Sequence, residues 1–179
     1  MRISTGWSTA AEAETAVREA YSRMSAGLDG PPSYLLLATS IDYAGETLIQ
    51  TLRTLAPDVP FQAGTSCRGV MSAAGYHRGA HGGLGLFGIY DPDGAYGVGS
   101  ADRGEDPRAA GAAAVAQAME AAGVDSGTPA LIWMGAAPGA EEQVLLGIAD
   151  EVGAHVPVVG GSTADNTVSG GWWQSAGSD

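Results

Sequence analysis

Apolar residues recur at helical spacing in several stretches of the chain. Residues 9–30 and 45–55 carry apolar side chains three and four positions apart, and the stretch between Gly139 and Gly153 repeats this spacing. These patterns predict three amphipathic helices. A fourth helix is expected to follow Asp106-Pro107, because an aspartate cap before a proline is a common helix start.

Short apolar runs alternate with these helices. The runs at 33–40, 59–66, 129–137 and 155–160 are typical of strands that are buried on both faces. Two further glycine-rich runs flank the turn sequence Asp-Pro-Asp-Gly, which predicts an antiparallel hairpin near residues 83–101. The alternation predicts an α/β protein with a mostly parallel or mixed sheet covered by helices.

The composition favours a globular protein. The 179 residues suit a single domain, and the 45% that are hydrophobic are dispersed among polar ones. No apolar run approaches the roughly 20 residues of a membrane-spanning helix. The first residues also lack the apolar segment of a secretion signal. We therefore expect a cytoplasmic protein.

Charge and cysteine content exclude several classes of binding partner and site. Twenty acidic residues against eight basic ones give a formal charge of −12, and the basic residues form no cluster. Nucleic acids and anionic membranes are therefore not expected as partners. The single cysteine, Cys67, excludes an internal disulfide and a multi-cysteine metal site. The glycines of 82–90 lack a phosphate-binding spacing, so we expect no cofactor.

Turns rich in small residues follow four predicted strands, at 40–43, 64–69, 135–139 and 160–166. In open α/β sheets ligands bind beyond the carboxyl ends of the strands, where such turns expose backbone N–H groups. We expect the turns at 64–69 and 160–166 to face each other and to hold a small polar ligand. The expected binding residues are Gly64, Thr65, Ser66, Cys67, Gly69, Gly160, Gly161, Ser162, Asp165 and Asn166.

Asp165 and Asn166 allow two interpretations. In the first, the Asp165 carboxylate pairs with an amine of the ligand and the Asn166 amide fixes its orientation. In the second, both side chains cap a helix or shape a turn and bind no ligand. The residue types alone do not decide between them.

The two turns resemble motifs of the FIST family, the F-box and intracellular signal transduction proteins. In that family the first turn commonly reads Gly-Cys-Ser-Thr-x-Gly-Glu, which Gly64, Ser66 and Gly69 match, and the second contains Gly-Gly-x-x-x-Asp-Asn. Here Gly160-Gly161 and Asp165-Asn166 match the second motif. The resemblance covers residues 1–166 and implies an intracellular sensory domain that binds small ligands such as amino acids.

The sequence also departs from the family pattern. Thr65 stands at the family's cysteine position, Cys67 at its threonine position and Val70 at its glutamate position. Family members usually continue into a second domain. We therefore expect residues 1–166 to form the sensory domain, residues 167–179 to be a C-terminal loop or truncated continuation, and a FIST-type C-terminal partner domain to be absent.

Catalysis is the alternative hypothesis. Cys67 is followed by Arg68, which would favour a thiolate, as a thiol-dependent hydrolase or transferase requires. The sequence does not place a histidine base beside it. His77 and His81 are four residues apart, but four glycines around them disfavour a helix, so we expect a solvated loop and not a metal pair. A noncatalytic sensor remains the main prediction.

Overall fold

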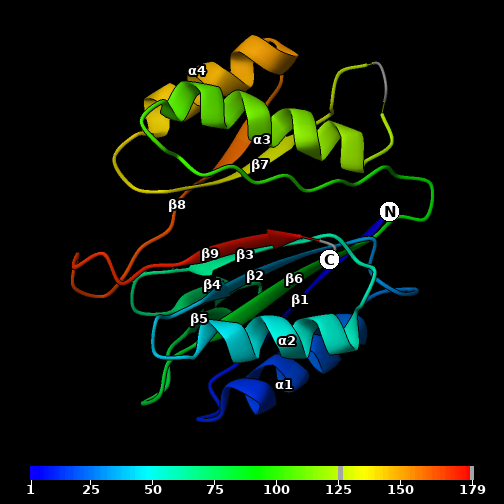
Figure 1. Ribbon diagram of the computed structural model, residues 1–179. Helices are drawn as coiled ribbons and strands as arrows, with labels where there is room; N and C mark the ends of the chain where they lie inside the picture. The colour runs from blue at the N-terminus through cyan, green and yellow to red at the C-terminus, as the bar shows by residue number, and fades with distance from the viewer. Residues whose placement is uncertain (125–126, 178–179) are drawn as a thin grey trace. The chain divides into compact units, whose positions relative to one another are not determined.

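The computed structural model describes residues 1–124 and 127–177 (Figure 1). The chain divides into two compact units. The first unit contains residues 1–94 together with the chain from Ala164 onward, and the second unit contains Ala95–Thr163. Each unit has its own sheet and its own pair of helices, and each is described by itself.

The first unit is built around a mixed sheet. Its five strands in the described chain run in the order β1-β6-β2-β3-β9. β2 and β3 are parallel, whereas the other neighbouring pairs are antiparallel. The expected α/β architecture with a mixed sheet is thereby confirmed. The strands are β1 (Arg2–Ser8), β2 (Tyr34–Thr39), β3 (Phe61–Thr65), β6 (Leu84–Tyr90) and β9 (Gln174–Gly177).

Two helices, α1 (Ala13–Ser25) and α2 (Gly45–Leu55), cover one face of this sheet (Figure 1). The apolar stripes of the helices and the inward side chains of the strands form the core, which the sequence pattern predicted. Gly6 lets α1 approach closely, because a Cβ atom at this position would lie 1.9 Å from the Ala20 carbonyl oxygen. Core residues that are almost completely buried include Val17, Met24, Leu35, Leu37, Leu48, Leu52, Phe61, Leu84 and Leu86.

The second unit contains α3 (Pro107–Ala121), β7 (Ile132–Ala136), α4 (Glu141–Val152) and β8 (Val158–Ser162). β7 and β8 are parallel neighbours. The side chain of Asp106 caps α3 by accepting hydrogen bonds from the N–H groups of the following turn, as its position before a proline predicted. α3 and α4 pack tightly because a Cβ atom at Gly147 would lie 1.9 Å from the Arg108 carbonyl oxygen.

The antiparallel hairpin does not lie at 83–101, where the sequence predicted it. The turn exists, since Gly94 N–H donates to the Asp91 carbonyl at 3.1 Å, but residues 95–101 form no strand and belong to the second unit. β6 pairs with β1 on one side and β2 on the other, so neither edge accepts a returning strand. The small hairpin of the described chain is instead β4 (Val70–Ser72) with β5 (Gly75–His77).

Two terminal segments also differ from expectation. Arg2–Ser8 forms an edge strand that the sequence pattern did not predict. Within the expected C-terminal loop, Gln174–Gly177 forms β9, which pairs with Phe61–Gly64. Its ladder extends the sheet because the Thr65 N–H and the Trp173 carbonyl, 3.0 Å apart, align the two segments. None of the described helices combines the length and apolarity that crossing a bilayer requires.

Candidate functional site

The turn after β3 has a defined backbone conformation. Ser66 N–H donates to the Thr39 carbonyl at 2.7 Å, which joins the ends of the parallel strands β2 and β3. The Ser66 hydroxyl then donates to the Gly69 carbonyl at 3.0 Å, and Gly69 N–H donates to the Cys67 carbonyl at 2.9 Å. Between them Arg68 has a φ of 64°, a left-handed conformation that is uncommon outside glycine. The turn therefore presents Cys67 and Arg68, both exposed.

The segment from Ala164 to Trp173 lies beside this turn in the first unit. Ala164 N–H donates to the Thr65 carbonyl at 3.0 Å. The buried Thr65 hydroxyl accepts from Trp173 N–H at 3.1 Å. Arg68 N–H donates to Asn166 Oδ1 at 2.6 Å. The structure thus brings Thr65–Gly69 together with Asp165 and Asn166, about a hundred residues later in the chain. We call Ser66–Gly69 and Ala164–Gly171 the paired turns.

Asp165 organises the second of these turns. Its side chain is only 4% exposed. One carboxylate oxygen accepts from Thr167 N–H at 2.9 Å, and the other accepts from Ser169 N–H at 2.9 Å and Gly171 N–H at 2.8 Å. Burial by itself raises the pKa of Asp165, but the backbone donors outweigh it and lower the pKa to about 2. The geometry therefore favours the turn-shaping interpretation of Asp165 over an amine-binding one.

Most backbone donors of the first turn are already used. The N–H groups of Thr65, Ser66, Arg68 and Gly69 all donate within the protein. Most of the backbone N–H groups that this turn was expected to offer a ligand are therefore already occupied. Within the described chain, the N–H of Cys67 has no hydrogen-bond partner. The groups that remain for a ligand are this N–H, the Arg68 guanidinium and the amide nitrogen of Asn166.

Gly160, Gly161 and Ser162 belong to β8 in the second unit. Gly160 has a φ of 127°, and a Cβ atom there would lie 1.9 Å from the Met134 carbonyl oxygen, so only glycine fits against β7. The Ser162 hydroxyl donates to the Glu141 carboxylate, which also accepts from Gly139 N–H. The Ser162 hydrogen bond is the main cause that lowers the pKa of Glu141 to about 2. Local packing and hydrogen bonding within the second unit account for these residues.

The loop at 40–43 is also explained by structure. Ser40 is fully buried, and its hydroxyl accepts from Gly83 N–H at 3.0 Å. The Tyr43 hydroxyl donates to the Ala10 carbonyl at 2.7 Å. A hollow with a volume of about 500 Å³ lies beside this loop, between the starts of α1 and α2, and Glu12, Glu14 and Asp42 are among its lining residues.

His77 does not lie in a solvated loop, so that expectation is wrong. It ends β5 with 7% of its surface exposed, and its ring stacks on Trp7 with centroids 3.9 Å apart. Its Nε2 atom is 2.7 Å from the Ser72 hydroxyl oxygen. His81 is exposed, as a loop residue would be. In the part of the chain that the structure describes, no three metal-ligating side chains come together.

Sequence reasoning missed two residues of this region as site components. Arg68 was noted only for its possible effect on Cys67, although its position inside a glycine-bounded turn of an acidic chain was a usable signal. The second is Trp173, whose ring packs on the start of α2. A Cβ atom at Gly45 would lie 2.8 Å from this ring. The tryptophan pair at 172–173 was the signal for this packing.

One comparison with known proteins gives a match. Residues 33–178 match the family model of the FIST N domain, which is most of the chain and includes both of the paired turns. The match continues past residue 166, so the residues of β9 fall within it. Neither the curated proteins nor the solved structures give a match.

Proposed function

Because the chain belongs to the FIST family, whose domains serve as sensory domains in signal transduction, we propose that it is a noncatalytic sensor of a small polar ligand. The ligand binds at the paired turns of the first unit and is amino-acid-like. The observation that carries this proposal is the hydrogen bond between Arg68 N–H and Asn166 Oδ1, which joins both family motifs in one place.

Arg68 supplies the recognition of an anionic group. Its side chain is exposed, and no ion pair to it is present among residues 1–124 and 127–177. The guanidinium places a positive charge at the paired turns of a chain whose formal charge is −12. Together with the adjacent N–H of Cys67 it offers donors that suit a carboxylate, since an arginine can bind one with two parallel hydrogen bonds.

The polar groups beside Arg68 complete the recognition of an amino acid. The amide nitrogen of Asn166 donates to the ligand, while Asn166 Oδ1 remains with Arg68 N–H. Asp165 is ionised at neutral pH, and its backbone donors, which lower its pKa to about 2, keep it ionised well below neutral pH. Its negative charge, next to Asn166 in the chain, favours a cationic group nearby without direct contact.

A catalytic role for Cys67 receives no support from its surroundings. The buried histidine of this unit, His77, is engaged with Trp7 and Ser72. A thiol nucleophile requires a base within hydrogen-bond reach, and the described residues make no hydrogen bond to the Cys67 thiol.

Thermal unfolding in the presence of individual amino acids tests the proposal. A ligand at 100 times its dissociation constant adds about 2.7 kcal/mol to the free energy of unfolding, which gives a clear rise in Tm. We expect at least one amino acid to produce this rise at millimolar concentration. If no amino acid raises Tm, the proposed function is wrong.

Two arginine variants locate the site. Arg68→Gln removes the guanidinium from the paired turns, and we expect it to weaken binding about tenfold or more, because a hydrogen bond to a charged group contributes about 1.5–3 kcal/mol. Arg78→Gln is the matched control, since Arg78 is exposed in the same unit but outside the paired turns. If both variants lowered the affinity for the amino acid equally, the effect would come from nonspecific electrostatics and the paired turns would not be the binding site.

A further inference from the structure

The β4–β5 hairpin is attached to the sheet by two inward side chains. Val70 is 4% exposed, and a Cβ atom at Gly85 of β6 would lie 3.3 Å from its Cγ2 atom. His77, its partner across the hairpin, is 7% exposed and stacks on Trp7 of β1 with an interplanar angle of 7°. The opposite side chains, Met71 and Tyr76, are exposed. Docking of the hairpin therefore includes one apolar contact and one aromatic stack, and the end of β5 also lies close to Gly83, where a Cβ atom would be 2.4 Å from the His77 carbonyl oxygen.

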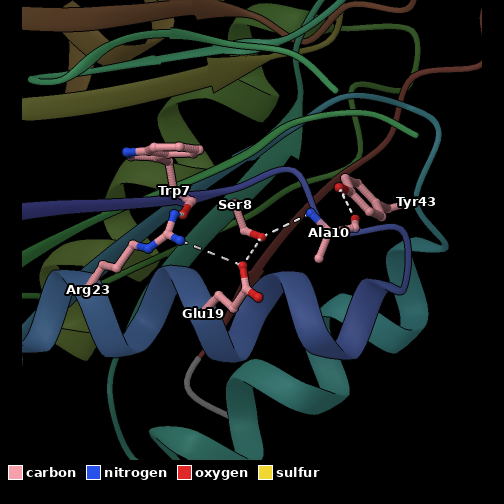
Figure 2. A network of polar contacts seen from close by, with 6 residues as sticks. All are labelled: Trp7, Ser8, Ala10, Glu19, Arg23 and Tyr43. Carbon is pink, nitrogen blue, oxygen red and sulfur yellow. Dashed lines mark hydrogen bonds and ion pairs between the residues drawn. The ribbon is translucent and has the colours of Figure 1, made fainter. Parts of the chain in front are cut away.

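A fixed positive charge lies on the same tryptophan. The guanidinium of Arg23 lies 4.5 Å from the centre of the Trp7 ring system, and Arg23 donates to the Trp7 carbonyl at 2.6 Å. Figure 2 shows how α1 holds this group: Glu19 pairs with Arg23 at 3.9 Å and also accepts from the Ser8 hydroxyl at 2.7 Å. The arginine is therefore kept close to the Trp7–His77 stack.

His77 consequently prefers its neutral form in this position. Burial is the main cause that lowers its pKa below the ordinary value of 6.5, and the charge of Arg23 lowers it further. β4 contains no titratable residue, and the titratable residues of β1 and β6, Arg2 and Tyr90, pair at the far end of their strands. On β5 itself Tyr76 points away from the sheet. Arg23, with its partner Glu19, is thus the charged group that faces the ring.

The docked hairpin also shapes the first of the paired turns. β4 begins at Val70, directly after Gly69. A Cβ atom at Gly69 would lie 2.7 Å from the Tyr76 hydroxyl oxygen and 2.8 Å from the His77 carbonyl oxygen. Because β5 packs this closely on Gly69, the conformation of Cys67 and Arg68 depends on where the hairpin sits.

We infer that the β4–β5 hairpin is a proton-sensitive latch on the paired turns: neutral His77 keeps it docked on Trp7, and protonated His77 releases it. Its consequence for ligand binding rests on the proposed function, but the latch itself is a property of the unliganded chain. Docking is most stable above pH 6.5, the ordinary histidine value, because His77 is then neutral in both the docked and the released hairpin. Docking weakens as the pH falls through the lower value of the docked state.

NMR titration of the full chain without ligand tests the latch. We expect the His77 imidazole signals to titrate with a midpoint below 6.5, and the backbone amides from Cys67 to His77 to shift and lose protection with the same midpoint. Titration of His77 without any change in these amides would overturn the proposal. So would a midpoint at or above 6.5.

Substitutions separate a switch from a merely structural stack. His77→Phe keeps an aromatic ring on Trp7 and should abolish the pH-dependent change of the hairpin amides. Arg23→Gln removes the nearby charge and should move the midpoint of the His77 titration upward toward 6.5. This shift tests the proposal even if His77→Phe does not fold. His81→Gln changes an exposed histidine and should leave the midpoint unaltered. A hairpin transition that persists in folded His77→Phe, or an unmoved midpoint in Arg23→Gln, contradicts the latch.

The latch and the proposed function fail separately. If no amino acid raises Tm but the hairpin amides follow His77, the latch stands and the ligand proposal is wrong. If an amino acid binds equally well on both sides of the His77 midpoint, the sensor proposal stands and control of the paired turns by the latch is wrong.

Discussion

Arg68 N–H donates a 2.6 Å hydrogen bond to Asn166 Oδ1, although 98 positions separate the two residues in the sequence. Arg68 reaches this partner in a left-handed conformation, with a φ of 64°. Such a conformation costs free energy for a residue with a Cβ atom and persists where surrounding contacts enforce it. The bond to Asn166 is therefore a structural link between the two family motifs.

Replacing Asn166 should loosen this link. In Asn166→Ala the Arg68 N–H loses its acceptor, and we expect the free energy of unfolding to fall by about 0.5–1.5 kcal/mol, the usual net contribution of one hydrogen bond. Hydrogen exchange at the Arg68 amide should become faster. Asn166→Asp keeps an acceptor oxygen at the same place and should retain most of the protection. Unchanged exchange at Arg68 in Asn166→Ala would show that the turn holds its conformation without this bond.

Asp165 should make the first unit sensitive to acid. Its pKa is lowered from 3.8 to about 2 in the folded protein, so its contribution to stability is present above 3.8 and is lost as the pH falls toward 2. Asp165→Asn presents an NH₂ group to backbone donors that need an acceptor, so it should destabilise the protein at neutral pH. The difference from the unmodified protein should shrink as the pH falls below about 4.

Urea unfolding across this pH range measures the Asp165 effect. Asp93→Asn is the matched control, because Asp93 is exposed in the turn between β6 and the second unit. It should leave both the stability and its pH dependence close to those of the unmodified protein. The role assigned to the carboxylate would be contradicted if the difference in free energy of unfolding between Asp165→Asn and the unmodified protein stayed constant down to the lowest pH.

Thr65 should contribute through its hydroxyl and not only through its methyl group. The side chain is 4% exposed, and its oxygen accepts from Trp173 N–H at 3.1 Å. Thr65→Val has nearly the same shape but leaves this N–H without its acceptor, so we expect a loss of about 1–3 kcal/mol in the free energy of unfolding. Thr54→Val, on an exposed position of α2, should change it by no more than about 0.5 kcal/mol. Equal effects in urea unfolding would exclude a special role for Thr65.

Gly6 should tolerate no larger residue. A Cβ atom there would lie 1.9 Å from the Ala20 carbonyl oxygen and 2.7 Å from the Met24 nitrogen, both in the backbone of α1. Gly6→Ala must push α1 away from β1, and we expect a loss of about 1–3 kcal/mol in the free energy of unfolding. Gly161→Ala is the control, since no atom lies within 4 Å of the added carbon. Similar midpoints of urea unfolding for both variants would contradict the close packing of α1.

Local sequence signals predicted the helices, most of the strands of the α/β architecture and the two turns that come together in the first unit. Helical spacing of apolar residues identifies α1, α2 and α4, and the Asp106-Pro107 cap identifies the start of α3, because these signals are local. The turns expected at the strand ends brought Thr65 and Asp165 into one region, and in the structure these two segments are neighbours. Whether the residues there bind a ligand remains a prediction.

The pairing partners of the strands and side chains, in contrast, follow from the three-dimensional packing. The Asp91–Gly94 turn is local and was predicted, but the segment after it cannot pair with β6, because β1 and β2 already occupy both edges. The carboxylate of Asp165 is satisfied by its own loop, and His77 is buried against Trp7, a residue 70 positions earlier. Hydrogen-bond satisfaction and burial depend on contacts between distant segments, which residue types and their spacing do not specify.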